Sequence, residues 1–322
     1  MKYKLDPELV DFAASIPYAA FDDPVAARAG LEEMAAPMHA YIDYTGFDVE
    51  DRVIEGPAQA PQVKVRLYTP HRAATQPVET AGLIYIHGGG FAVGSPDTEH
   101  FTASMLAREL KIVVVSVDYR LAPEHPYPAG LEDCYAALCW FHQQADTLGV
   151  DRDRIGVLGQ SAGGGLSAAL ALLARDRNGS ALCFQYLGMP ELDDRLQTTS
   201  MREFVDTPLW NRPSAVNSWK YYLGERYQPG GDDVPIYAAP ARASIEDLRA
   251  LPPAYITAME FDPLRDEDVQ YALKLMEAGV PVELHTFPGT FHGSTLVLTA
   301  AVSQRQHHEM LDVLRRGLKL AA

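Results

Sequence analysis

Six short, continuously apolar segments are the feature that most restricts how this chain folds. Most are separated by stretches long enough for a helix, and they are AGLIYIH (81–87), KIVVVSVD (111–118), RIGVLGQ (154–160), ALCFQYLGM (181–189), PAYITAME (253–260) and VPVELHTF (280–287). Strands that are apolar along their whole length are typical of a parallel sheet covered by helices on both faces. The helices between and after them are expected at residues 98–110, 128–145, 162–176, 264–278 and 299–319.

Two earlier segments have a different pattern. FDVEDRVI (47–54) and QVKVRLYTP (62–70) alternate apolar and polar residues, as half-buried antiparallel strands do, and they predict a hairpin-like edge of the sheet. Together the patterns predict an α/β protein with a mostly parallel central sheet of about eight strands and helices on both faces.

Two regions do not follow this alternation of strands and helices. Residues 5–40 contain two helical patterns, which begin at Asp6-Pro7 and Asp23-Pro24. Residues 190–245 separate two predicted strands, and an insertion of this length at one end of a sheet is usually functional. We therefore expect four parts: residues 1–45 as the N-terminal part of a helical cap, 46–189 as the first part of the α/β core, 190–245 as the cap insertion, and 246–322 as the second part of the core.

Charge excludes two classes of partner. The 322 residues include 43 acidic and 27 basic side chains, and the formal net charge of −16 repels nucleic acid and anionic lipid. The first residues, MKYKLDPELVDFAAS, carry acids where a secretory signal would be apolar. No apolar run approaches the roughly 20 residues that span a bilayer. We expect a cytoplasmic protein with neither nucleic acid nor a membrane as partner.

The cysteines and histidines do not indicate a metal site. Cys134, Cys139 and Cys183 form no CxxC pair and cannot all pair within one chain, which fits structural thiols in a reducing compartment. The HHEM sequence at His307 lacks the HExxH spacing that places two imidazoles on one helical face. We expect neither a metal nor a cofactor.

The corner between residues 154–160 and 162–176 carries a serine. Gly159-Gln160-Ser161-Ala162-Gly163 has the GxSxG spacing of the nucleophile elbow of α/β-hydrolases. A strand that turns directly into a helix has strained backbone angles, and the two glycines remove Cβ atoms that would collide there. The following helix adds N–H groups and a positive dipole end beside the serine. A glycine-rich helix start with a capping serine is the alternative reading of this pentapeptide alone.

A second glycine motif, IYIHGGGFAVGS, follows an earlier apolar strand. Gly88, Gly89 and Gly90 allow backbone N–H groups to point into one concavity, where they can hold an oxyanion together with the N–H of Ala162. Gly89 and Gly90 are the preferred donors and Gly88 a substitute. A P-loop is excluded because no GK[ST] follows. His87, which precedes the glycines, is expected to organise the loop.

A serine nucleophile needs an imidazole base, which in turn needs a carboxylate. His292 follows a strand in the loop FPGTFHGS, whereas His285 lies inside a strand pattern and His307 lies in the last helix. Asp262 follows an apolar strand directly, at the end of the sheet where open α/β folds bind their ligands. The neighbouring acids, residues 266–268, are expected to stabilise the first turn of a helix.

At this point the sequence resembles the hormone-sensitive lipase family of carboxylesterases, also called bacterial family IV. The resemblance covers nearly the whole chain and rests on HGGGF (87–91), DYRLAPEHPYPAG (118–130), GQSAGG (159–164), DPLRDE (262–267) and HG (292–293). It implies the α/β-hydrolase fold, a helical cap and a triad at Ser161, Asp262 and His292, in the chain order of that fold.

The resemblance also implies roles outside the triad. It places the oxyanion donors in the glycine loop and at Ala162, and it gives Asp118, Arg120 and Glu124 a supporting structural role. Two positions depart from the family pattern: Gln160 replaces a common aspartate, and Gly165 replaces a frequent asparagine.

The sequence therefore predicts a serine carboxylesterase that hydrolyses short- to medium-chain esters through an acyl-enzyme, with a small-molecule ester as its substrate. An amide, lactone or carbamate hydrolase with the same triad is the alternative. A non-catalytic receptor is a further alternative, since plant gibberellin receptors resemble this family without the catalytic histidine, but the presence of His292 argues against it. Members of this family occur as monomers or homodimers, and a homodimer is a state that the resemblance allows.

Overall fold

The computed structural model describes residues 2–18, 21–71 and 79–320. Its centre is an eight-stranded sheet in the order β1-β2-β4-β3-β5-β6-β7-β8. The strands are β1 Phe47–Ile54, β2 Val63–Pro70, β3 Thr80–Ile86, β4 Val113–Asp118, β5 Val150–Gln160, β6 Gln185–Gly188, β7 Ala254–Phe261 and β8 Val282–Phe291. The pairs β1–β2 and β2–β4 are antiparallel and all the other pairs are parallel. The predicted mixed sheet with an antiparallel edge is therefore confirmed.

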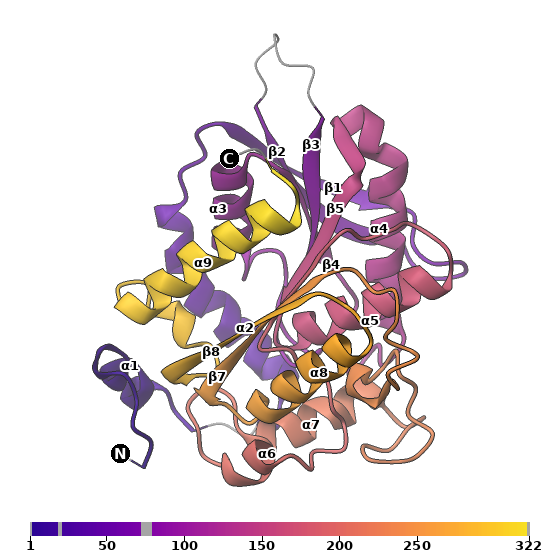
Figure 1. Cartoon of the computed structure of the whole chain (residues 1–322). Helices are drawn as coiled ribbons and strands as arrows, with labels where there is room; N and C mark the ends of the chain where they lie inside the picture. The colour runs from indigo at the N-terminus through magenta and orange to yellow at the C-terminus, as the bar shows by residue number, and fades with distance from the viewer. Residues whose placement is uncertain (1, 19–20, 72–78, 321–322) are drawn as a thin grey trace.

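Helices cover both faces of this sheet (Figure 1). On one face lie α3 (His100–Leu110) and α9 (Ala301–Gly317), whose apolar residues pack with those of β3 and β4. On the other face lie α4 (Ala129–Leu148), α5 (Ala162–Asp176) and α8 (Arg265–Glu277). Residues 162–174 of α5 are all buried, because this helix lies between the sheet and its neighbours. All five helices predicted around the sheet are present, within a few residues of the expected ends.

The remaining helices lie in the two regions predicted as the cap. The N-terminal region contains η1 (Pro7–Leu9), α1 (Val10–Ser15), α2 (Pro24–Ala35) and η2 (Ala36–Tyr41), and Asp6 and Asp23 are N-caps as their Asp-Pro sequences predict. The insertion contains α6 (Thr199–Glu203), α7 (Arg212–Leu223) and η3 (Pro240–Arg242), and the short η4 (Ser294–Leu296) follows β8. Figure 1 shows α6 and α7 together beside β7, below the sheet.

Two strand boundaries differ from the prediction. The chain from Pro288 to Phe291 was expected to be a loop but continues β8. β8 is the last strand of the sheet, and an edge strand tolerates a proline because one row of its N–H groups has no partner strand. β6, by contrast, is shorter than its apolar segment and begins at Gln185.

The described chain has no helix with the length and apolar character needed to cross a bilayer. Cys134, Cys139 and Cys183 form no disulfide, and Cys134 is buried. Within the same residues, no three His, Cys, Asp or Glu side chains are grouped in a way that would hold a metal ion.

Candidate active site

The corner between β5 and α5 is a strained turn that presents one serine. Ser161 has φ 56° and ψ −126°, a conformation that non-glycine residues rarely adopt. A Cβ atom at Gly159 would lie 2.1 Å from the carbonyl oxygen of Gly163, and one at Gly163 would lie 2.2 Å from that of Ile86. The backbone therefore requires glycine on both sides of Ser161, which is the physical reason for the spacing seen in the sequence.

The two residues predicted to activate this serine meet it in space. The Nε2 atom of His292 lies 2.9 Å from Ser161 Oγ, and its Nδ1 atom lies 2.6 Å from Asp262 Oδ2. The other oxygen of Asp262 accepts a hydrogen bond from the N–H of Leu264 at 2.9 Å. Since a carboxylate can only accept, Nδ1 carries the proton and Nε2 is free to accept the serine hydrogen.

These three residues come from the ends of three elements. Ser161 follows β5, Asp262 follows β7, and His292 follows β8. Asp262 has no exposed surface, and Ser161 and His292 are each only 8% exposed. The hydroxyl and imidazole are therefore screened from bulk water but remain open to a small molecule.

The glycine loop lies against the same serine. A Cβ atom at Gly88 would lie 3.0 Å from the carbonyl oxygen of Gln160 and 3.6 Å from Ser161 Cβ. Gly89 and Gly90 have positive φ values of 115° and 53°. In the described chain no protein acceptor is bonded to the N–H groups of Gly89 or Gly90, nor to that of Ala162 at the first position of α5. These N–H groups remain available for an anion.

His87 and Tyr119 support this loop from behind. The ring of His87 is buried, its Nδ1 lies 2.8 Å from the carbonyl oxygen of Gly88, and burial lowers the pKa of its imidazole to about 4. Tyr119 stacks on that ring at 4.1 Å and donates its hydroxyl hydrogen to the His87 carbonyl oxygen at 3.0 Å. His87 therefore stays neutral and organises the loop, as the sequence suggested.

The support expected from Asp118, Arg120 and Glu124 takes a different form. Arg120 forms a bidentate pair with the buried carboxylate of Asp133, at 2.8 Å for each contact. Glu124 binds Arg28 of α2, at 2.7 and 2.8 Å. The carboxyl group of Asp118 is half-buried, which raises its pKa. Arg120 and Glu124 thus tie α4 and the N-terminal region to the core. Tyr119, which lies next to Arg120 in the sequence, contacts the glycine loop instead.

The acids that follow Asp262 lie in the predicted first helical turn and also make contacts that the sequence does not reveal. Asp266, Glu267 and Asp268 do lie in the first turn of α8, but Glu267 and Asp268 are fully buried. Burial raises the pKa of both carboxyl groups well above the usual range. Glu267 binds the backbone of residues 192–193, and Asp266 binds that of Ser200. Asp266 and Glu267 therefore also anchor residues 192–193 and the start of α6.

Aromatic side chains of residues 190–245 and of the N-terminal region lie beside the site. Trp210 lies with its ring centroid 5.7 Å from that of His292, and it also contacts Phe21 of the N-terminal region at 5.7 Å. Tyr222 of α7 stacks on Phe91 of the glycine loop at 3.9 Å, and Trp219 beside it has no exposed surface. Most of these aromatics therefore form a core between α7 and the glycine loop, while Trp210 lies beside His292.

Sequence reasoning missed two residues near this centre, Glu191 and Ser218. Glu191 is fully buried three residues after the end of β6, and Ser218 is fully buried on α7. The rule that selected Asp262, a polar residue just after a buried parallel strand, would also have selected Glu191. No comparable signal marks Ser218, whose position depends on how the insertion folds back.

Comparison with known proteins agrees with this geometry. The family model described as the alpha/beta hydrolase fold matches residues 83–296. Carboxylesterase NlhH from Mycobacterium tuberculosis is 40% identical over an alignment of 301 positions that covers 90% of this chain and 88% of that protein. The chain belongs to the hormone-sensitive lipase family of α/β-hydrolases.

Further relatives place this family member among the carboxylesterases. Esterase LipI from Mycobacterium tuberculosis is 38% identical over 91% of this chain and 88% of its own length. Among solved structures, a bacterial heroin esterase is 51% identical, superposes with a TM-score of 0.94, and is matched over 98% of both chains. The protein is a carboxylesterase of the α/β-hydrolase fold, and its substrates are esters.

Proposed function

We propose that Ser161, His292 and Asp262 are the catalytic triad of this carboxylesterase. The observation that carries the proposal is the continuous contact from Ser161 Oγ to His292 Nε2 and from His292 Nδ1 to Asp262, with distances of 2.9 and 2.6 Å. Both distances fall within hydrogen-bond reach, which a nucleophile and its base require.

In the proposed reaction, His292 removes the hydroxyl proton of Ser161 as the oxygen attacks the acyl carbon. The tetrahedral oxyanion accepts hydrogen bonds from the N–H groups of Gly89, Gly90 and Ala162, with Gly88 as a substitute donor. His292 then protonates the leaving alcohol, and an acyl-enzyme remains. A water molecule, activated by His292, releases the acid, while Asp262 stays ionised and stabilises the imidazolium. No step needs a metal or a cofactor.

We further propose that the N-terminal region and residues 190–245 form a cap that limits the substrate to short and medium acyl chains. Trp210 and Phe21 lie over Gly90, since a Cβ atom at Gly90 would lie 2.7 Å from the Trp210 ring and 3.0 Å from that of Phe21. The name of the heroin esterase suggests that a short acyl group on a bulky alcohol also fits a cap of this kind. Amides, lactones and carbamates remain the alternative substrates for the same triad.

Covalent labelling tests the nucleophile. Treatment with a fluorophosphonate is expected to place the label on the peptide that contains Ser161, because the activated oxygen displaces fluoride from phosphorus. Peptide mass spectrometry of the labelled protein identifies the residue, with protein denatured before labelling as the control. A label found on another serine would refute the assignment of Ser161.

A series of 4-nitrophenyl esters tests the limit on chain length. We expect kcat/KM to be greatest for acyl chains of about two to six carbons and to fall by more than about tenfold at about twelve carbons, because Trp210 and Phe21 occupy the space that a long chain needs. Trp210→Ala is expected to shift the optimum to longer chains. An optimum at long chains in the unmodified enzyme would contradict the proposed size limit.

A further inference from the structure

Glu191 lies directly behind the proposed nucleophile. It has no exposed surface, and its N–H donates to the carbonyl oxygen of Ser161 at 3.0 Å. A Cβ atom at Gly165 would lie 2.2 Å from the carbonyl oxygen of Glu191. The lack of a side chain at Gly165 therefore allows the segment after β6 to lie against α5.

The side chain of Glu191 is linked to the glycine loop through the cap. Its Oε2 atom lies 3.2 Å from Ser218 Oγ, and Ser218 Oγ lies 3.1 Å from the carbonyl oxygen of Gly90. Ser218 belongs to α7 and is itself fully buried. Across the described residues, the Oε1 atom of Glu191 has no hydrogen-bond partner. The three groups form a line from a buried carboxyl group to the loop.

The two contacts of Ser218 Oγ indicate whether the Glu191 carboxyl group is ionised or neutral. A serine hydroxyl has one hydrogen, whereas an ionised Glu191 and the Gly90 carbonyl would both require it. An ionised carboxylate with one shared hydrogen bond and no cation beside it is strongly disfavoured in a buried position. A neutral carboxyl group donates from Oε2 to Ser218 Oγ, and the Ser218 hydrogen is then free for Gly90. Only the neutral form supplies one hydrogen for each of the two contacts.

We propose that Glu191 is a positioning residue whose protonated carboxyl group, acting through Ser218, holds the Gly90 carbonyl and so fixes the glycine loop for oxyanion binding. This inference rests on the function proposed above, because the loop matters only if it stabilises the oxyanion formed at Ser161. It also assigns a structural task to the cap, since the intermediate hydroxyl group belongs to α7.

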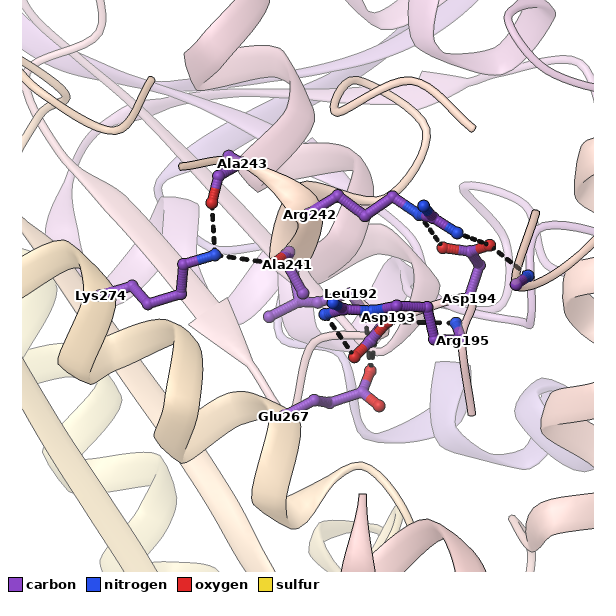
Figure 2. Close-up of polar contacts among 10 residues, drawn as sticks. Leu192, Asp193, Asp194, Arg195, Ala241, Arg242, Ala243, Glu267 and Lys274 are labelled. Carbon is purple, nitrogen blue, oxygen red and sulfur yellow. Dashed lines mark hydrogen bonds and ion pairs between the residues drawn. The ribbon is translucent and has the colours of Figure 1, made fainter. Parts of the chain in front are cut away.

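Side-chain contacts hold the segment that follows Glu191 (Figure 2). Glu267 Oε1 accepts hydrogen bonds from the N–H groups of Leu192 at 2.7 Å and Asp193 at 3.1 Å. Asp194 forms a bidentate ion pair with Arg242, at 2.5 and 2.8 Å. The backbone is thus held immediately after Glu191, in the segment that follows β6.

The charged surroundings also favour the neutral form. Among the described residues, the carboxyl groups of Asp262 and Glu267 and the phenols of Tyr119 and Tyr222 interact with Glu191, and these four groups carry no positive charge. Burial, together with the negative field of Asp262, raises the pKa of Glu191 to about 8. Glu191 is therefore mostly protonated at neutral pH and loses its proton in mildly alkaline solution.

Loss of that proton has a defined consequence. Oε2 then takes the Ser218 hydrogen, the Gly90 carbonyl loses its donor, and a negative charge arises close to the developing oxyanion. Because the neutral form is the productive one, kcat is expected to be highest below pH 8 and to decline as the pH rises through about 8.

The test compares pH profiles of kcat for 4-nitrophenyl butyrate, from about pH 6 to about pH 10, in the unmodified enzyme and in Glu191→Gln. Glutamine donates from its amide to Ser218 but does not ionise, so the variant is expected to lose the alkaline decline while its kcat at neutral pH falls about threefold. Glu191→Ala and Ser218→Ala are each expected to lower kcat about tenfold or more with little change in KM, and the double variant to be no worse than either single one.

Glu99→Gln is the matched control. Glu99 is another carboxyl group whose pKa is raised by burial, and it accepts one hydrogen bond, from the hydroxyl of Tyr85 at 2.7 Å. This variant is expected to keep the alkaline decline of the unmodified enzyme. The same alkaline decline in Glu191→Gln, or its loss in Glu99→Gln, would overturn the inference.

Two further measurements separate the possible failures. Thermal unfolding followed by circular dichroism shows whether Glu191→Ala is folded. If it is not, Glu191→Gln carries the test, because it keeps the side-chain volume. Full turnover by Ser161→Ala would refute the proposal that Ser161 is the nucleophile. If Ser161→Ala is inactive but the Glu191 variants resemble the unmodified enzyme, the triad stands and only the role of Glu191 is wrong.

Discussion

Substitution of Ser161 by alanine is expected to lower kcat for 4-nitrophenyl butyrate by about a millionfold, because the members of a triad act as a unit. The residual rate would come from substrate binding and from the N–H groups of the glycine loop, which the substitution leaves in place. Steady-state or single-turnover kinetics on purified protein measure the effect.

Ser167→Ala is the matched control for this variant. Ser167 lies on the same helix, is fully buried, and donates its hydroxyl hydrogen to the carbonyl oxygen of Gly163 at 2.7 Å. Its loss removes one hydrogen bond, worth about 1 kcal/mol of stability, and no reacting group. Turnover close to normal in Ser161→Ala, or an equal loss of turnover in Ser167→Ala, would refute the assignment of the nucleophile.

Substitution of Asp262 by asparagine is expected to lower kcat by about ten thousandfold, with the protein still folded. The amide is nearly the same size as the carboxylate, so the packing is kept. Its NH₂ group, however, can donate to His292 Nδ1 and so favour the tautomer that places the proton on Nε2, where it blocks transfer from Ser161. The pH profile of kcat, measured with thermal unfolding on the same samples, checks this expectation.

Asp266→Asn provides the corresponding control at a neighbouring position. The carboxylate of Asp266 accepts a hydrogen bond from the N–H of Ser200 at 2.7 Å, so it contacts α6 and not His292. Turnover in this variant should remain close to that of the unmodified enzyme. If Asp262→Asn were as active as Asp266→Asn, the proposed role of Asp262 would be wrong.

Much of this fold can be predicted from the sequence because strand burial and backbone sterics restrict which residues occur locally. Strands such as β3 and β4 are buried on both faces along most of their length and are therefore mostly apolar, which separates them clearly from the amphipathic helices. The elbow can be recognised for another reason: a Cβ atom at position 159 or 163 would collide with the backbone, so both positions require glycine. His292 and Asp262 were predicted because each follows a strand at the end of the sheet where these folds bind ligands.

The parts that the sequence did not predict depend on contacts between distant segments. Nothing in the local sequence distinguishes an acid in the first turn of a surface helix from Glu267, which is buried because the segment after β6 places two backbone N–H groups on it. Likewise, the role of Ser218 depends on the insertion folding back until α7 touches Gly90. The extension of β8 through Pro288 was missed because the sequence does not say which strand lies at the edge.

The hydrogen bond between Ser218 and the Gly90 carbonyl has a consequence for protein engineering. A chimera that carries the 190–245 insertion of another esterase would also place a new side chain against the glycine loop beside Ser161. A chimera that retains a serine at position 218 should preserve turnover of simple esters. A chimera that lacks this serine should be slow on every substrate, whatever the shape of its new insertion.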